Sequence, residues 1–203
     1  MEQSQDIHIV LAHYNEDISW TKNILIPYTV ISRQGLPKET PPNKGNEASS
    51  YLEYIIKNYN NLHDYTIFLH AHRSAWHHTG NIDNTINNLI FEHGYMNIND
   101  GKDEDYTLKN SGAEVAFLRV LPIVNSILNT NIDYHDLRFK LAAQFYVKKE
   151  NILRHPIHIY KSLYEYLMIS PYTSNWTGTA YEYLWHYIFT GELHDKHVSF
   201  LKL

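Results

Sequence analysis

Residues 7–12 and 65–69 are short apolar runs rich in β-branched and aromatic side chains, and each stops abruptly at polar residues. Such runs predict buried strands. Residues 28–32 predict another strand, and residues 48–59 carry apolar side chains at helical spacing. The order strand, strand, helix, strand is typical of an α/β sheet with parallel neighbours. We therefore expect an α/β fold, a three-layer sandwich with a mostly parallel central sheet.

The second half of the chain predicts further helices and one late strand. Residues 113–128 have a largely helical pattern, and Pro156 suits the first turn of another helix. Residues 141–147 predict a strand because β-branched and aromatic side chains are concentrated there. Residues 170–178 are expected to form a loop, and residues 180–189 a last helix.

The chain has 203 residues, 43% of them hydrophobic, which is enough for a substantial core. No linker or internal repeat is visible, so we expect a single domain over residues 1–203. The formal net charge is -5 with histidine neutral, which argues against nucleic acid as a partner. There is no cysteine, so disulfides, thiol catalysis and cysteine-bound metals are excluded.

No run approaches the ~18 apolar residues that a membrane span needs, and the start of the chain lacks the features of a signal peptide. We therefore expect no membrane span and a cytoplasmic location. The frequent use of Asn, Ile, Lys and Tyr favours an AT-rich genome, such as that of a virus.

The segment 67–78 is the strongest candidate for a site. It places four histidines, an arginine and a tryptophan directly after a buried strand. Side chains on an extended segment repeat every second residue, so His70 and His72 are expected to point the same way. Neutral imidazole is a common ligand of transition metals, and ligands of α/β sheets bind outside the carboxyl ends of strands. The polar ends after Ala12 and Leu69 should therefore face one cleft.

The end of the first strand supplies five further candidates: His13, Tyr14, Asn15, Glu16 and Asp17. Ligands of α/β sheets bind at such strand ends, so we expect this segment to contribute to the site. The two carboxylates at its end are also candidates for a catalytic base or a metal ligand.

Cationic and aromatic side chains elsewhere add to this cleft. Lys44 and Glu47 stand at the start of the predicted helix 48–59. Arg73, Arg33 and Lys44 are candidates to neutralise a phosphate, and arginine is favoured because its guanidinium binds two oxygens at once. Trp76 is a candidate to stack on a sugar or base ring.

On the predicted last helix, Glu182 and His186 lie four residues apart and therefore share one face. A carboxylate and an imidazole at this spacing support metal ligation or proton transfer. We assign Glu182 as a candidate base and His186 as a candidate metal ligand.

Several segments together resemble an uncharacterised family, the domain of unknown function 3431. The matching segments are residues 12–20, 43–52, 68–77, 142–152 and 184–189, in that order along nearly the whole chain. The family has no established activity, so this resemblance implies a fold rather than a reaction.

The chain is also distantly similar to A-type glycosyltransferases, in which a strand ends in an Asp-x-Asp motif that holds a nucleotide-sugar diphosphate through a metal. His70 and His72 stand in the equivalent place. Imidazoles there would favour Mn or Zn over Mg, or would let Arg73 contact the diphosphate without a metal. The resemblance implies a nucleotide-sugar donor, a glycan or small-molecule acceptor, and Glu182 as the acceptor base. It also implies that residues 13–17, Lys44 and Glu47 lie near the nucleotide.

Two other functions fit the same residues. One is a histidine-ligated metal-dependent hydrolase that uses a zinc-bound water. The other is a non-catalytic glycan-binding module whose groove is lined by Trp, Tyr and His. The sequence leaves all three hypotheses open.

Overall fold

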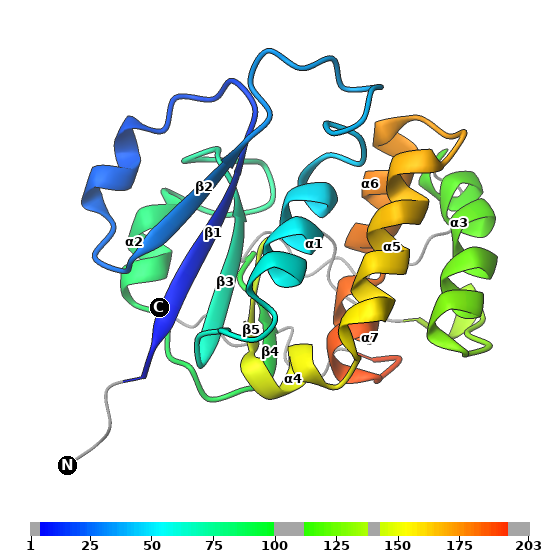
Figure 1. Cartoon of the computed structure of the whole chain (residues 1–203). Coiled ribbons are helices and arrows are strands. Elements are labelled where there is room, and N and C mark those ends of the chain that lie inside the picture. Colours follow the sequence, from blue (N-terminus) through cyan, green and yellow to red (C-terminus); the bar gives the residue numbers. More distant parts are fainter. Residues whose placement is uncertain (1–4, 100–111, 138–142, 195–203) are drawn as a thin grey trace.

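The computed structural model describes residues 5–99, 112–137 and 143–194 (Figure 1). In chain order, with η for a 3-10 helix, the elements are β1 (Ile7–His13), η1 (Ser19–Asn23), β2 (Tyr28–Ser32), α1 (Glu47–Asn58), β3 (Tyr65–His70), α2 (Ile82–Asn87), β4 (Tyr95–Asn97), α3 (Gly112–Leu128), η2 (Tyr134–Asp136), β5 (Phe145–Lys148), α4 (Lys149–Leu153), α5 (Ile157–Ile169), α6 (Ser174–Glu182) and α7 (Trp185–Thr190). These elements confirm the α/β class.

The five strands form one sheet in the order β2-β1-β3-β5-β4. β1 pairs in parallel with β2 and β3, but β5 is antiparallel to both β3 and β4. The expectation of a mostly parallel sheet is therefore wrong, because the sheet is mixed. The apolar pattern that predicts a strand carries no information about its direction.

The reversed strand has a consequence for the edge of the sheet where β3 ends. Phe68 in β3 pairs with Phe145, the first residue of β5, so β5 enters the sheet near the point where β3 leaves it. Gln144 immediately precedes β5 and so lies at this edge. The predicted late strand contained these residues but began too early, and its residues 141 and 142 lie outside the described part.

Side chains alternate between the two faces of the sheet, as the period of two requires. One face carries Val10, Phe68, Phe145 and Val147, which share a core with side chains of α1, α3, α5, α6 and α7. The opposite face carries Ile9, Leu11, Ile67 and Leu69, which pack with Trp20 of η1 and with Ile82 and Ile86 of α2. Figure 1 shows α1, α5 and α3 to one side of the strands and α2 to the other. Helical turns thus cover both faces of the sheet.

The helix predicted over residues 48–59 is confirmed as α1, and the one predicted after Pro156 is confirmed as α5. The end of the chain differs from the prediction. Thr173 caps α6 by accepting a hydrogen bond from the main-chain N–H of Trp176, so the helix begins inside the predicted loop. The helix then ends at Glu182, and a separate helix, α7, begins at Trp185. The single helix predicted over residues 180–189 is therefore wrong.

Trp20 ties the segment after β1 to the segment after β3. Its indole N–H donates to the main-chain oxygen of Ala71, 3.0 Å away, and the ring is buried. We expect Trp20→Phe to lower the free energy of unfolding by about 1–3 kcal/mol, because the oxygen of Ala71 loses its buried partner. Urea unfolding measures this change. The matched control is Trp76→Phe at a ring that is 74% exposed, for which we expect a change below about 0.5 kcal/mol. Equal midpoints for the two variants would contradict the role of this bond.

Candidate functional site

Polar side chains gather where β1 and β3 end. His13 is the last residue of β1 and His70 the last residue of β3, and Ala12 pairs directly with His70. Because the two strands are parallel neighbours, the segments that follow them leave the same edge of the sheet. The prediction that these polar ends face one cleft is consistent with this register.

A cavity of about 510 Å³ opens at this edge. Its lining residues are Glu47, His70, His72, Ser74, Ala75, Trp76, His77, Ala143, Thr179 and Glu182. We call it the large cavity. It brings together residues from the start of α1, the end of β3 and the end of α6, which are far apart in the sequence.

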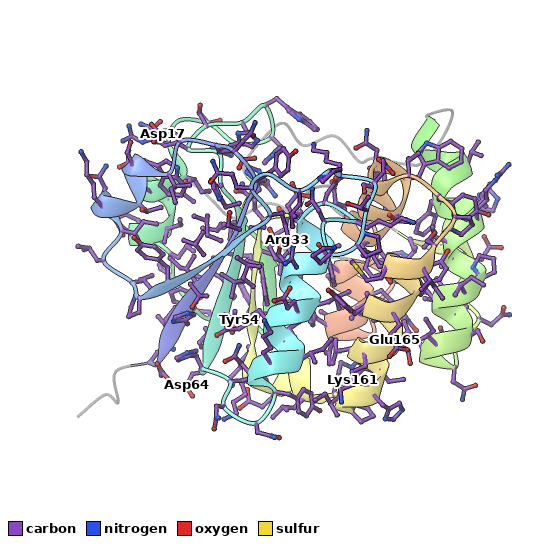
Figure 2. All side chains as sticks on the ribbon, turned by 45° about the horizontal axis from the view of Figure 1, so that its top comes forward. Asp17, Arg33, Tyr54, Asp64, Lys161 and Glu165 are labelled. Atoms are coloured by element: carbon purple, nitrogen blue, oxygen red, sulfur yellow. The ribbon has the colours of Figure 1, made fainter. Side chains whose placement is uncertain are left out.

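A second, smaller hollow of about 150 Å³ adjoins the first, because the two share Glu47 and His72 in their walls. It is lined by Ala12, His13, Tyr14, Glu16, Arg33, Lys38, Asn43, Asn46, Glu47, Ser50 and His72. We call it the small hollow. Figure 2 shows Arg33 beside the N-terminal part of α1.

Two carboxyl groups, Glu47 and Glu182, line the large cavity. Burial raises the pKa of Glu182 to about 8, and the nearby Glu47 carboxylate adds to this rise. Burial also raises the pKa of Glu47, and the charge of Glu16 adds to this rise, while a main-chain hydrogen bond and the charges of Lys38 and His72 oppose it. At pH 7 Glu182 is therefore mostly protonated, and Glu47 is the carboxyl that ionises more readily.

Glu16 is held in its ionised form. Burial opposes ionisation, but Oε2 accepts main-chain hydrogen bonds from Tyr14 at 2.7 Å and from Asn15 at 3.0 Å, which lower the pKa of this carboxyl. The other oxygen, Oε1, lies 3.6 Å from Nε2 of His72. Glu16 thus anchors the segment after β1 and orients His72, and its low pKa makes it a weak base.

His70 is a buried and neutral imidazole. Burial lowers the pKa of His70 well below its ordinary value, and the neighbouring histidines lower it further. Its Nε2 lies 2.8 Å from Nε2 of His77, and its Nδ1 faces the main-chain N–H of His72 at 3.4 Å. Both ring nitrogens of His70 are therefore engaged by groups of the protein.

Among the described residues, no group of three or more His, Asp or Glu side chains is placed to hold a metal ion. His70 and His72 both line the large cavity, with ring centroids 5.2 Å apart, but His186 does not. His186 is buried in α7, with its ring 5.3 Å from that of Tyr95. The break between α6 and α7 means that His186 and Glu182 do not share a helix face.

One family model matches residues 9–199, and its description is "Protein of unknown function (DUF3431)". The chain belongs to this family. No curated protein and no solved structure matches the chain. Membership in the family therefore does not identify a reaction. In the described residues, no helix has both the length and the apolar character needed to cross a bilayer.

Besides Arg33, the two cavities are lined by eight of the site residues predicted from the sequence. They are His13, Tyr14, Glu16, Glu47, His70, His72, Trp76 and Glu182. The segments that carry them come from the ends of β1 and β3 and from the two helices whose ends meet there. The predicted cleft therefore has a physical counterpart.

Two predicted phosphate contacts lie elsewhere. The amine of Lys44 is buried and donates to the main-chain oxygen of Ser170, below the loop that leads to α6. The guanidinium of Arg73 donates to both carboxylate oxygens of Asp83, at 3.2 and 3.0 Å. Neither side chain lines a cavity at this edge. Both cations are already satisfied by the fold, which the sequence does not reveal.

Asp17 and Asn15 also lie outside the two cavities. The carboxylate of Asp17 accepts from the main-chain N–H and the hydroxyl of Ser19, at 2.8 and 2.9 Å, so it starts the turn into η1. Figure 2 shows Asp17 near the outer edge of the molecule. Asn15 is exposed and contributes its main-chain N–H to Glu16.

Several residues of the site were missed by sequence reasoning. Lys38 lines the small hollow with its amine 5.5 Å from the ring centre of Tyr14, and it comes from a proline-rich loop with no recognisable motif. Asn99 binds His77 but follows a strand of three residues, which is too short to detect. His77 lies in the histidine run and was not singled out from its neighbours.

Proposed function

We propose that this protein is a glycosyltransferase-like enzyme that moves a sugar from a nucleotide-sugar donor to a hydroxyl of a glycan or small-molecule acceptor. The observation that supports it best is the pair of adjoining cavities at the ends of β1 and β3, which share Glu47 and His72. Two substrates that react with each other need two joined subsites. The predicted cytoplasmic location belongs to this proposal, and fractionation of expressing cells tests it.

The large cavity suits the sugar and the acceptor. Its volume of about 510 Å³ lies within the range of small-molecule sites. Trp76 in its wall is 74% exposed and offers the face of an indole ring to a sugar. Ser74 and Thr179 supply hydroxyl groups for hydrogen bonds.

The small hollow suits the phosphate end of the donor. Arg33 and Lys38 line it. Arg33 is one of the three cations predicted from the sequence for this role, and Lys38 takes the place of Arg73 and Lys44. Arg33 pairs with Glu53 as Arg73 pairs with Asp83, but Arg33 lines this hollow and Arg73 does not. A guanidinium and an ammonium are the usual protein partners of phosphate oxygens.

The carboxyl pair supplies the proton chemistry. In the proposed step, the acceptor oxygen forms a bond to the anomeric carbon of the sugar while the bond from that carbon to the diphosphate oxygen breaks. Glu47 takes the hydroxyl proton, and the nucleoside diphosphate leaves with the electron pair of the broken bond. Glu182, protonated at pH 7, donates a hydrogen bond to the substrates. The proposed base is therefore Glu47, whereas the sequence analysis assigned this role to Glu182.

A divalent metal, Mn or Zn, is implied by the resemblance to A-type glycosyltransferases. The described residues do not fit this group in their present arrangement, because both nitrogens of His70 are engaged and no three ligands converge. We therefore write the reaction with Arg33 and Lys38 as the groups that neutralise the diphosphate.

Thermal unfolding in the presence of UDP-, GDP- and CDP-sugars tests the proposal. A donor at ten times its Kd adds about 1.4 kcal/mol of stability, which corresponds to a rise in Tm of roughly 3–6 °C for a chain of this size. We expect one class of donor to produce this rise, and Lys38→Ala to abolish most of it. Lys161→Ala is the matched control, at an exposed lysine on α5 that Figure 2 labels.

Release of nucleoside diphosphate separates an enzyme from a binding module. Binding with no release from any donor and acceptor would favour the glycan-binding alternative. No rise in Tm with any of the three donor classes would contradict the proposed substrate.

A further inference from the structure

Behind the large cavity, five polar side chains from three segments form one connected hydrogen-bond network. They are His70, His77, His78, Asn99 and Gln144. Asn99 and Gln144 are 2% and 0% exposed, and His70 and His78 are also buried. Polar groups this deep in the protein are costly unless each proton faces an acceptor, so the network constrains where its protons lie.

The direction of the network is fixed at Asn99 by main-chain groups. The main-chain N–H of Asn99 can only donate, and it faces Oδ1 of Asn97 at 2.9 Å, which identifies that atom as the oxygen. The side-chain Nδ2 of Asn99 lies 2.8 Å from this oxygen and 3.2 Å from the main-chain oxygen of Gln144. Both neighbours are acceptors, so this atom is the amide nitrogen, and Oδ1 of Asn99 is left to accept.

The next two links follow from this orientation. Oδ1 of Asn99 lies 2.6 Å from Nδ1 of His77, so His77 carries its proton on Nδ1. Burial lowers the pKa of His77, which leaves the ring neutral and its Nε2 without a proton. That nitrogen lies 2.8 Å from Nε2 of His70, so His70 must donate from Nε2.

The His70 end of the hydrogen-bond network independently supports the same direction of hydrogen-bond donation. A neutral His70 with a proton on Nε2 has a free electron pair on Nδ1. The group that faces Nδ1 is the main-chain N–H of His72, at 3.4 Å, and it can only donate. Main-chain groups of fixed polarity at both ends therefore require one and the same placement of protons between them.

A side branch agrees as well. Nε2 of His78 faces the main-chain oxygen of Arg73 at 3.2 Å and must donate to it. Gln144 directs its amide nitrogen to Oδ1 of Asn99 at 2.9 Å and to Nδ1 of His78 at 3.3 Å. Within the described residues, Oε1 of Gln144 is left without a hydrogen-bond partner. This unmet acceptor is the cost of pointing both amide protons into the network.

We infer that Asn99 is a positioning residue, which fixes the tautomers of His77 and His70 through a directed chain of hydrogen bonds and so presents a neutral, non-rotating imidazole wall to the large cavity. The acid–base work of the site then falls to Glu47 and Glu182. While this hydrogen-bond network is intact, His70 does not release a proton and has no free ring nitrogen. This inference does not depend on the identity of the substrate.

Nitrogen NMR of the full chain labelled with ¹⁵N-histidine tests the inference. Long-range ¹H–¹⁵N correlations at pH 7.5 distinguish a proton on Nδ1 from a proton on Nε2. We expect His77 in the Nδ1–H form, and His70 and His78 in the Nε2–H form. A proton on Nδ1 of His70, or an averaged pattern like that of free histidine, would overturn the inference, and this readout requires no substrate and no variant.

Two substitutions at Asn99 separate positioning from packing. Asn99→Leu keeps the approximate shape but removes the acceptor, so we expect His77 and His70 to populate both tautomers. Asn99→Asp keeps an oxygen in front of His77, so we expect the proton to return to Nδ1 of His77. Asn88→Leu, at an exposed asparagine after α2, is the matched control and should leave all tautomers unchanged. Unchanged tautomers in Asn99→Leu would also overturn the inference, and if that variant does not fold, the pattern of the unaltered chain decides.

Discussion

Glu47→Gln is expected to lower kcat by about 10²–10⁴-fold, the usual effect of removing a general base. Glu182→Gln is expected to lower kcat less than about tenfold, because glutamine keeps a donor where the protonated carboxyl had one. The difference follows from the two pKa values, since Glu182 holds its proton up to about pH 8 and Glu47 ionises more readily. Release of nucleoside diphosphate with saturating donor measures both rates.

The pH profile provides the control for this assignment. In the unaltered protein, kcat should fall as the pH rises through about 8, because Glu182 loses the proton with which it donates a hydrogen bond to the substrates. Glu182→Gln should lack this fall. Glu165→Gln, at an exposed carboxylate on the outer surface of α5, should match the unaltered protein (Figure 2). A larger loss of kcat in Glu182→Gln than in Glu47→Gln would mean that Glu182 is the base.

The part of the fold that local patterns encode was predictable. β1 and β3 are continuous apolar runs buried on both faces of the sheet, and α1 buries apolar side chains at helical spacing, so the pattern identifies each element and its end. The position of a site at the ends of β1 and β3 follows from the same patterns, because parallel neighbours end at one edge. The direction of β5 was not predictable, since it depends on where the chain returns to the sheet.

The candidate site was predictable where its residues follow a strand and unpredictable where they come from distant segments. His70 and His72 stand out because imidazoles directly follow a buried run. Lys44 and Arg73 have the same residue types as true phosphate ligands, but Ser170 and Asp83 occupy them in the folded chain. Such pairings join residues whose proximity only the tertiary structure creates.

The break between α6 and α7 shows how packing overrides a helical pattern. Residues 180–189 carry apolar side chains at helical spacing, but the chain leaves the helix after Glu182. On both sides of the break the aromatic side chains stay in the core, where Tyr181 and Trp185 are buried with ring centroids 5.5 Å apart. The same break separates Glu182 from His186, which removes the predicted carboxylate and imidazole pair and gives Glu182 to the large cavity.

The raised pKa of Glu182 should also make the stability of the protein depend on pH. An ordinary glutamate loses its proton near pH 4.5 in the unfolded chain, whereas burial raises the pKa of Glu182 to about 8 in the folded chain. Between these values the folded state binds a proton that the unfolded state does not. The contribution of Glu182 to the free energy of unfolding therefore decreases as the pH rises from about 4.5 to about 8 and levels off above that range.

Glu182→Gln should remove this pH dependence. At about 1.4 kcal/mol for each pKa unit the full shift corresponds to roughly 5 kcal/mol, but the carboxyl lines an open cavity, so we expect about 2 kcal/mol. The variant should match the unaltered protein at pH 5 and exceed its Tm by roughly 4–8 °C at pH 8. Glu165→Gln should show the same Tm as the unaltered protein at both pH values. A Glu182→Gln variant that is no more stable at pH 8 than at pH 5, relative to the unaltered protein, would mean that water or a bound cation keeps this carboxylate ionised, and the assignment of Glu182 as the protonated member of the pair would be wrong.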